Sequence, residues 1–285
     1  MRAYRHFILL FIATLCASAV TQQLLLPNKP DSVRFAVIGD NGTGDSRQYD
    51  TAARLIEWRS LFPYTFVLMM GDNMYGGEKP KDFANKFERP YMPLTQAGVK
   101  FYASLGNHDD PENQRAYKGY NMGGERFYTF KPKNGVRFFA LDSNYMDKAQ
   151  LEWLDKELSA SGSDWKICYF HHPLYSSGAT HGSAVDLRGL VEPLFIKHKV
   201  NVVFYGHEHF YERIKPQKGI YYFISGCAGK LRKGDIRKTD LTAKGYDNDN
   251  SFMLLEVAGD QLSFQTITRA GQTIDSGVIN RQNSK

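Results

Sequence analysis

Short apolar runs that end in a polar residue or glycine recur along the first four fifths of the chain. Runs of this length, bounded by Gly, Asn or Asp, are typical of strands buried in a sheet. We predict such strands at residues 33–40, 64–72, 100–109, 165–173, 200–209 and 219–226. Apolar residues at helical spacing predict three helices, marked by Tyr49, Ala52, Ala53 and Ile56, by Leu151, Leu154 and Leu158, and by Leu187, Leu190, Val191, Leu194 and Phe195.

Two further parts of the chain are predicted to be β-structure. Residues 126–142 contain two apolar runs joined by "KPKNG", a pattern that predicts a hairpin. Residues 251–279 predict strands with turns at Gly259-Asp260 and at Gly271. The order of these elements predicts an α/β fold through about residue 210, followed by a β-rich end.

Polar side chains that can bind a metal follow five of the predicted strands. Ligands of α/β sheets bind at the carboxyl ends of strands, so we expect these side chains to converge at one edge of the sheet. The spacing of His207 and His209 aims both imidazoles to one side of an extended chain. A single residue of this kind is usually a turn residue or a helix cap, but five such strand ends indicate a site. The candidates are Asp40, Asp72, Asn107, His171, His207 and His209.

The chemistry of these candidates limits the kind of metal site. They offer oxygen and imidazole nitrogen but no thiolate, a set that suits iron, manganese or zinc. They are too many for one tetrahedral ion and fit two ions that share a carboxylate. Paired ions clamp the attacking and leaving oxygens of a phosphoryl displacement. A nucleotide-binding loop is the alternative interpretation of "GDNGTG" at 39–44, but this stretch lacks G-x-G-x-x-G spacing and a following Lys-Ser/Thr.

The N-terminus has the features of an export signal. Arg2 and Arg5 precede an apolar run, and Ala17-Ser18-Ala19 provides a small-x-small cleavage site. The run is shorter than the roughly 20 apolar residues that span a membrane. We therefore predict that residues 1–19 are a signal peptide and that the mature chain is secreted or periplasmic, without stable membrane insertion. An uncleaved anchor is the alternative.

The remaining composition adds little to this picture. The formal charge of the 285 residues is +6, and it falls to +4 after cleavage because only Arg2 and Arg5 are lost among charged residues. Basic residues are concentrated in 229–244, where they would either attract phosphate-bearing substrates or be solvated. This stretch has no interleaved aromatic residues, so we predict no nucleic-acid surface. Cys168 and Cys227 would either pair or remain buried thiols.

Five short motifs resemble, in order, the metal-binding motifs of the metallophosphoesterases. They are "GDNG" at 39–42, "GDNMY" at 71–75, "GNHD" at 106–109, "FHHP" at 170–173 and "GHEH" at 206–209. Tyr75, three residues after Asp72, makes the chain similar to the purple acid phosphatases, and its size resembles their small, tartrate-resistant type. "HFYER" after the last motif resembles the large plant enzymes instead. The fold implied is one catalytic domain, residues 32–282, with two packed β-sheets flanked by helices in an αββα sandwich.

The resemblance also implies a role for each motif residue. His108 would donate a proton to the leaving alcohol. His181 resembles another active-site histidine of the small enzymes, although its spacing is one residue longer. His171 matches the ligand position better than His172, because the family's histidine lies two residues before the proline. The implied ligands are Asp40, Tyr75 and His209 for Fe(III), Asp72 as the bridge, and Asn107, His171 and His207 for a divalent iron, zinc or manganese ion.

The function implied is an acid phosphatase that cleaves small phosphomonoesters by in-line attack of metal-bound hydroxide and acts as a monomer. A phosphodiesterase with the same metal site is one alternative, distinguished by its relative activity on aryl monoesters and diesters. A non-catalytic, metal-dependent binding protein is another. Against it, the chain keeps every expected ligand and also keeps His108.

Overall fold

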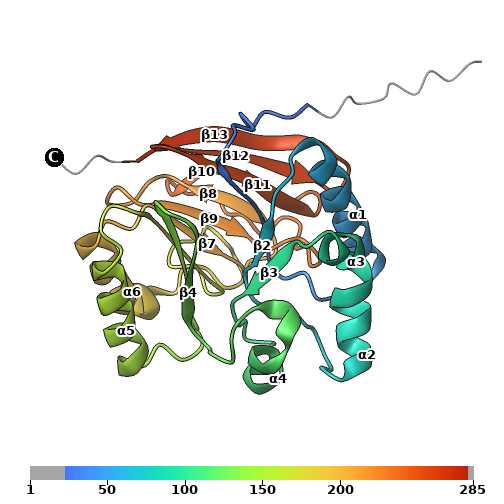
Figure 1. Cartoon of the computed structure of the whole chain (residues 1–285), viewed down its shortest axis with the longest axis horizontal. Coiled ribbons are helices and arrows are strands. Elements are labelled where there is room, and N and C mark those ends of the chain that lie inside the picture. Colours follow the sequence, from blue (N-terminus) through green and yellow to red (C-terminus); the bar gives the residue numbers. More distant parts are fainter. Residues whose placement is uncertain (1–22, 282–285) are drawn as a thin grey trace, which may run out of the picture.

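Two β-sheets pack face to face, and helices cover the outer face of each (Figure 1). The computed structural model describes residues 23–281, so the predicted signal peptide at 1–19 lies outside the described residues. The first sheet is covered by α1 (Ser46–Leu61), α2 (Pro80–Phe83) and α3 (Arg89–Gln96), and the second by α5 (Lys148–Ser159) and α6 (Val185–Lys197). The predicted arrangement of two packed sheets flanked by helices is confirmed.

The first sheet contains strands from both the N-terminal and the C-terminal parts of the chain. Its central strand, β1 (Val33–Ile38), runs parallel to β2 (Phe66–Met69) and antiparallel to β11 (Ser251–Ala258). Beyond β2 lies β3 (Lys100–Ala103), and beyond β11 lie β12 (Gln261–Thr268) and β13 (Thr273–Asn280). The predicted turns at Gly259-Asp260 and Gly271 connect these last three strands.

The second sheet is built from the middle of the chain. Its strands β5 (Val136–Ala140), β6 (Trp165–Phe170), β7 (Val202–Tyr205) and β9 (Tyr221–Ser225) are parallel neighbours. The predicted hairpin forms between β4 (Tyr128–Lys133) and β5. The opposite edge is completed by β8 (Tyr211–Ile214) and β10 (Thr242–Tyr246).

Aromatic rings fill the space between the two sheets. Phe35 and Phe66 from the first sheet meet Phe138 from the second edge to face, with ring centroids 5.1 and 5.3 Å apart. Edge-to-face pairs of this kind contribute about 0.5–1.5 kcal/mol each beyond their buried area. This packing fixes the two sheets relative to each other and therefore fixes the loops that follow their strands.

The helix after β1 forms where predicted but turns a different face to the sheet. Leu55 and Trp58 are buried in α1, together with Gln48, Thr51 and Ala52, whereas Tyr49 is 36% exposed. Gln48 is buried because its side chain bonds to Gly44 N and to Lys86 O. The carboxylate of Asp45 caps the helix by accepting from the amides of Arg47 and Gln48, two of the groups that a phosphate would otherwise contact. This capping gives no support to the nucleotide-loop interpretation.

Some elements were not predicted. The helices in residues 80–96 include Pro80, Pro90 and Pro93, which hide the helical period. Pro90 has no amide hydrogen to give to Lys86 O, and the Gln48 side chain donates to that oxygen instead. A short helix, α4 (Pro111–Ala116), follows β3 and is capped by Asp110.

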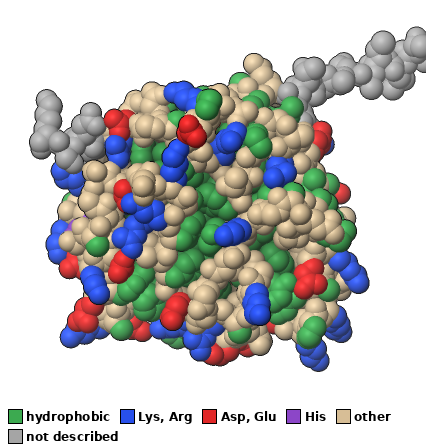
Figure 2. All heavy atoms as spheres, viewed as in Figure 1, with side chains coloured by type: hydrophobic (Ala, Val, Ile, Leu, Met, Phe, Trp, Pro, Cys, Tyr) green, Lys and Arg blue, Asp and Glu red, His purple; other side chains and the backbone are tan. Residues whose placement is uncertain are grey.

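Charged side chains of both signs are interspersed on the surface of the molecule. On the face seen in Figure 2, Lys and Arg side chains lie among Asp and Glu side chains.

Cys168 and Cys227 are buried free thiols in different core clusters, so the alternative in which the two cysteines do not pair holds. Among residues 23–281, no helix combines the length and apolarity needed to cross a membrane.

Candidate metal centre

The loops that follow the strands of both sheets meet on one side of the molecule. Asp40, Asp72 and Asn107 follow β1, β2 and β3 of the first sheet. His171 directly follows β6, and His207 and His209 follow β7 of the second sheet. The expectation of convergence is correct, but the expectation of one sheet edge is wrong, because the side chains come from two sheets. One direct link crosses between them: His207 N donates to Asp40 Oδ2 over 2.9 Å.

The backbone at these turns is held in an uncommon conformation. Asp40, Asp72 and His207 have φ angles of 52°, 50° and 68°, in the left-handed region. Non-glycine residues rarely occupy this region, and each costs on the order of 1–2 kcal/mol. A β-carbon at Gly106 would lie 2.1 Å from Asp72 N, and one at Gly206 would lie 2.6 Å from Asp40 Oδ2. The glycines that precede Asn107 and His207 are therefore needed for the close approach of the loops.

One group of ligand atoms gathers around Asp40. The ligand atoms of Asp40, Asp72 and His209 lie within 4.8 Å of one another. The hydroxyl of Tyr75 donates to Asp40 Oδ1 over 3.0 Å and lies 3.2 Å from His209 Nε2. His209 Nε2 is itself 3.4 Å from Asp40 Oδ1. The three side chains that the resemblance assigns to one ion are thus in mutual contact.

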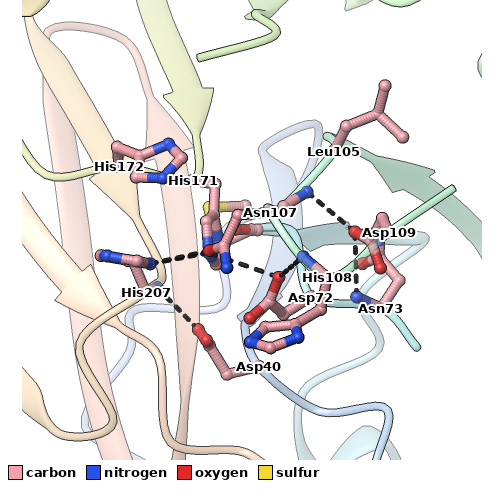
Figure 3. Close-up of polar contacts among 12 residues, drawn as sticks. Asp40, Asp72, Asn73, Leu105, Asn107, His108, Asp109, His171, His172 and His207 are labelled. Carbon is pink, nitrogen blue, oxygen red and sulfur yellow. Dashed lines mark hydrogen bonds and ion pairs between the residues drawn. The ribbon is translucent and has the colours of Figure 1, made fainter. Parts of the chain in front are cut away.

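A second group gathers around Asn107, at the centre of Figure 3. Asn107 Oδ1 lies 3.0 Å from His171 Nε2 and 3.0 Å from His207 Nδ1, and these two nitrogens are 3.1 Å apart. His171 Nε2 also lies 3.4 Å from Asp72 Oδ1. Asp72 therefore touches both groups, as expected of a bridging carboxylate.

The adjacent histidines His171 and His172 differ in their surroundings. His171 is fully buried, and its Nδ1 lies 2.9 Å from the carbonyl oxygen of Met70. Donation from Nδ1 to that carbonyl leaves the Nε2 lone pair directed at Asn107 and Asp72, the usual arrangement of a metal-binding histidine. His172 Nδ1 instead lies 2.9 Å from Ser143 Oγ. His172 also offers a nitrogen within 4.8 Å of those of His171 and His207, so it borders the same group.

The electrostatics of the cluster favour a bound cation. Burial, and then the charge of Asp72, raises the pKa of the Asp40 carboxyl. Burial also raises the pKa of the Tyr75 phenol, with further contributions from Asp40 and Asp72. Burial lowers the pKa of His209 to about 4, assisted by Arg232, and lowers the pKa of His171 and His207. Neutral imidazoles and crowded carboxylates are the donor set that iron, zinc or manganese accepts, so the residues fit two such ions.

Both predicted catalytic histidines border this cluster. His108 is exposed; its backbone N donates to Asp72 Oδ1 over 3.0 Å, and its ring lies 4.9 Å from that of Tyr75. His181 is also exposed, and its ring centroid lies 4.2 Å from that of His207. The two histidines therefore lie beside different ligand groups.

One feature of the site was missed by sequence reasoning. Asp109 is the acceptor for the amides of Gly106, Asn73 and Met74, and it joins the loops that carry Asp72 and Asn107 (Figure 3). Its place at the end of "GNHD" was the available signal. The position of the basic stretch at 229–244 bears on its two predicted roles, attraction of phosphate-bearing substrates or simple solvation. Lys230 Nζ lies 4.4 Å from the Tyr75 ring centroid, so part of this stretch reaches the cluster.

Comparisons with known proteins agree with this geometry. The family model described as "Calcineurin-like phosphoesterase" matches residues 33–211. Human tartrate-resistant acid phosphatase type 5 is 26% identical over 90% of this chain and 95% of its own. Purple acid phosphatase 4 of Arabidopsis thaliana is also 26% identical, over 90% and 86% of the two chains.

Two solved structures share the fold. GAP50, the anchor in the inner membrane complex of Plasmodium, superposes with a TM-score of 0.77 at 20% identity, covering 89% of this chain and 90% of its own. Purple acid phosphatase PPD1 of yellow lupin superposes with a TM-score of 0.70 at 20% identity, covering 90% of this chain and 55% of its own. With its match to the family model and its clustered motif residues, the chain belongs to the calcineurin-like phosphoesterases, and these two relatives are a tartrate-resistant and a purple acid phosphatase.

Proposed function

We propose that this chain is an acid phosphatase that hydrolyses small phosphomonoesters at a binuclear metal site. Its catalytic domain is residues 32–282, and it acts as a monomer. One ion is Fe(III) and the other is divalent iron, zinc or manganese. The proposed ligands are Asp40, Tyr75 and His209 for the first ion, Asn107, His171 and His207 for the second, and Asp72 for both.

The position of Asp72 carries this proposal. Its carboxylate lies in the group of Asp40 and His209, and its Oδ1 is 3.4 Å from His171 Nε2 in the other group. Asp72 is 1% exposed, so two uncompensated carboxylates, Asp40 and Asp72, would share a dry site. A buried charge of this kind is costly unless it is paired or coordinates a metal.

The residues around the cluster would have different roles in phosphoester hydrolysis. When bound, two such ions polarise the phosphoryl oxygens and lower the pKa of water so that it attacks at neutral pH or below. His108 would give a proton to the departing alkoxide. His181 and Lys230 would stabilise negative charge that develops on the phosphoryl oxygens. Lys230 is suited to this because its Nζ lies beside Tyr75.

A cavity beside the second ligand group offers space for the alcohol part of the substrate. It has a volume of about 500 Å³ and is bordered by Asn107 and His172. Leu105, Tyr145 and Leu187 line it on the apolar side. A small aromatic or aliphatic alcohol fits such a surface, which supports a monoester as the substrate.

The monoesterase proposal is tested by comparing two aryl substrates. We expect purified, metal-loaded protein to hydrolyse para-nitrophenyl phosphate with a higher kcat/KM than bis(para-nitrophenyl) phosphate. The opposite order would make the chain a phosphodiesterase. Hydrolysis of neither substrate at full metal content would identify it as a binding protein.

The assignment of Tyr75 to the ferric ion predicts colour. Charge transfer from a phenolate to iron absorbs visible light, so iron-loaded protein should be pink or purple. Tyr75→Phe should abolish the band, because the ring remains and only the phenolate oxygen is lost. A visible spectrum of both proteins at equal iron content checks this. An iron-loaded wild-type protein without a band would exclude Tyr75 as a ligand.

We also propose that the protein is exported and that the mature chain begins at Val20. The charged start, apolar run and Ala17-Ser18-Ala19 support this proposal. N-terminal sequencing of the protein from its native host should give Val20 as the first residue. Recovery of a chain that begins at Met1 or Arg2 would contradict cleavage.

A further inference from the structure

We propose that the buried carboxylates Glu208 and Asp235 and the partly exposed Arg232, together named the clamp below, position His181 beside the ligand His207. The clamp holds the loop of residues 176–183, which carries His181. This inference rests on the proposed function, because it concerns how His181 is placed for phosphoester hydrolysis. Glu208 would act through that loop and is thus a positioning residue.

Glu208 is the residue between the two ligand histidines of "GHEH". Its side chain is fully buried. Oε1 accepts from Ser176 Oγ over 3.0 Å and from Gly182 N over 2.7 Å. These two donors lie near the two ends of the loop, so one carboxylate oxygen closes the loop around it.

Asp235 holds the other neighbour of His181. Thr180 Oγ1 donates to Asp235 Oδ1 over 2.6 Å, and Ala179 N donates to Asp235 O over 2.8 Å. With Gly182 bonded to Glu208, both residues adjacent to His181 are anchored to buried carboxylates. The backbone of His181 is fixed from both sides, although its ring is exposed.

Arg232 joins the two carboxylates and connects them to the metal-binding loop. Its Nη1 lies 3.9 Å from Glu208 Oε2 and 3.6 Å from Asp235 Oδ2. Its backbone N donates to His209 O over 2.9 Å. Within residues 23–281, these three side-chain atoms have no hydrogen-bond partner, so the cluster is held at this point by charge. The guanidinium offsets the negative charge of two buried carboxylates.

The loop of residues 176–183 packs closely against the Glu208 carboxylate. A β-carbon at Gly178 would lie 2.0 Å from Glu208 Oε1. Gly178 also forms an isolated antiparallel bridge with Ile236, next to Asp235. The clamp therefore connects three segments that are distant in sequence: the His181 loop, the metal-binding loop and residues 232–236.

A fixed loop matters because His181 has to meet the substrate from an exposed position. A catalytic group gains most when its geometry is set before the substrate binds. The ring centroid of His181 is 4.2 Å from that of His207, and loss of the anchors would free this contact. The clamp would thus hold His181, an exposed loop residue, in a fixed position before the substrate binds.

The test compares Glu208→Ala, Glu208→Gln, His181→Ala and the double variant Glu208→Ala/His181→Ala. We expect Glu208→Ala and His181→Ala each to lower kcat on an alkyl phosphate, on the order of 10²-fold. The double variant should be no worse than either single variant, because both remove the same contribution. Glu208→Gln keeps an oxygen for Ser176 and Gly182, so it should retain most of the activity. Both metals should remain bound in every variant.

Hydrogen exchange provides a readout that does not depend on activity. Amides of residues 176–183 should exchange at least about tenfold faster in Glu208→Ala than in wild type, and near the wild-type rate in Glu208→Gln. Glu256→Ala is the matched control, because Glu256 is also buried and accepts from the amides of Asn28 and Lys29. It should leave the exchange of 176–183 and the effect of His181→Ala unchanged.

The possible failures are distinguishable. Unchanged exchange in Glu208→Ala, additive losses in the double variant, or loss of metal in Glu208→Ala would each overturn the clamp. Faster exchange together with full activity of His181→Ala would support the clamp but overturn the role of His181 in the proposed function. An inactive wild-type protein whose loop still depends on Glu208 would likewise support the clamp and overturn the proposed chemistry.

Discussion

Asp72→Asn should lower kcat on a phosphomonoester on the order of 10³-fold and reduce the metal content of the purified protein. The reason is that Asp72 is in contact with both ligand groups, so its charge serves both ions. Loss of several kcal/mol of charge stabilisation corresponds to a rate loss of this size, since about 1.4 kcal/mol is tenfold. Asparagine keeps the size of the side chain and an oxygen that can accept from His108 N. Only the charge is removed.

The measurement is kcat on para-nitrophenyl phosphate together with metal analysis. Asp275→Asn is a suitable control, because Asp275 is a largely buried carboxylate that accepts from Tyr211 and Arg213, away from the ligand groups. It should keep both the metals and the activity. Full activity of Asp72→Asn would show that this carboxylate does not bridge two metal ions.

His108→Ala should lower kcat on an alkyl phosphate by about 10²–10⁴-fold and much less on para-nitrophenyl phosphate. The alkoxide needs a proton to leave, whereas nitrophenolate is a good leaving group without one. His108 is exposed beside Tyr75 and is tied to Asp72 only through its backbone, so its imidazole can approach a substrate. Both metals should remain bound.

The comparison requires kcat for both substrates at matched metal content. His198→Ala is the control, because His198 is bonded to Asp155 on the outer helices and should show no dependence on the leaving group. Equal losses on the two substrates in His108→Ala would exclude His108 as the proton donor and make His181 the next candidate.

Local patterns predicted most of the parallel strands but not how the strands assemble. Apart from Arg34 and Lys166 near their starts, the runs before Asp40, Asp72 and His171 are apolar because these strands are buried on both faces. Nothing local shows that β11 pairs with β1, since the two are joined only by tertiary packing. The strand pattern therefore predicts that the ligands lie at the edge of one sheet, whereas the structure divides them between two sheets. The buried face of α1 also differs from the predicted one, because the sequence gives no sign that the polar residue Gln48 is buried.

The candidate site was predicted to the extent that its residues lie at strand ends. Asp40, Asp72, His171 and His207 directly follow β-strands or their glycines, and the sequence marks such positions. Glu208 could not be assigned in this way. Its partners Ser176 and Gly182 lie on a loop more than 20 residues away in sequence. The burial that gives Glu208 a role arises only when the loops have met.

The most direct test of the central claim is phosphate release from para-nitrophenyl phosphate while metal is removed and restored. With a binuclear site, the purified chain should bind two metal ions, lose activity on chelation, and recover it only when the second ion per chain is restored. Full activity without metal or with a single ion would contradict a binuclear phosphatase site, as would the absence of phosphate release at two ions per chain.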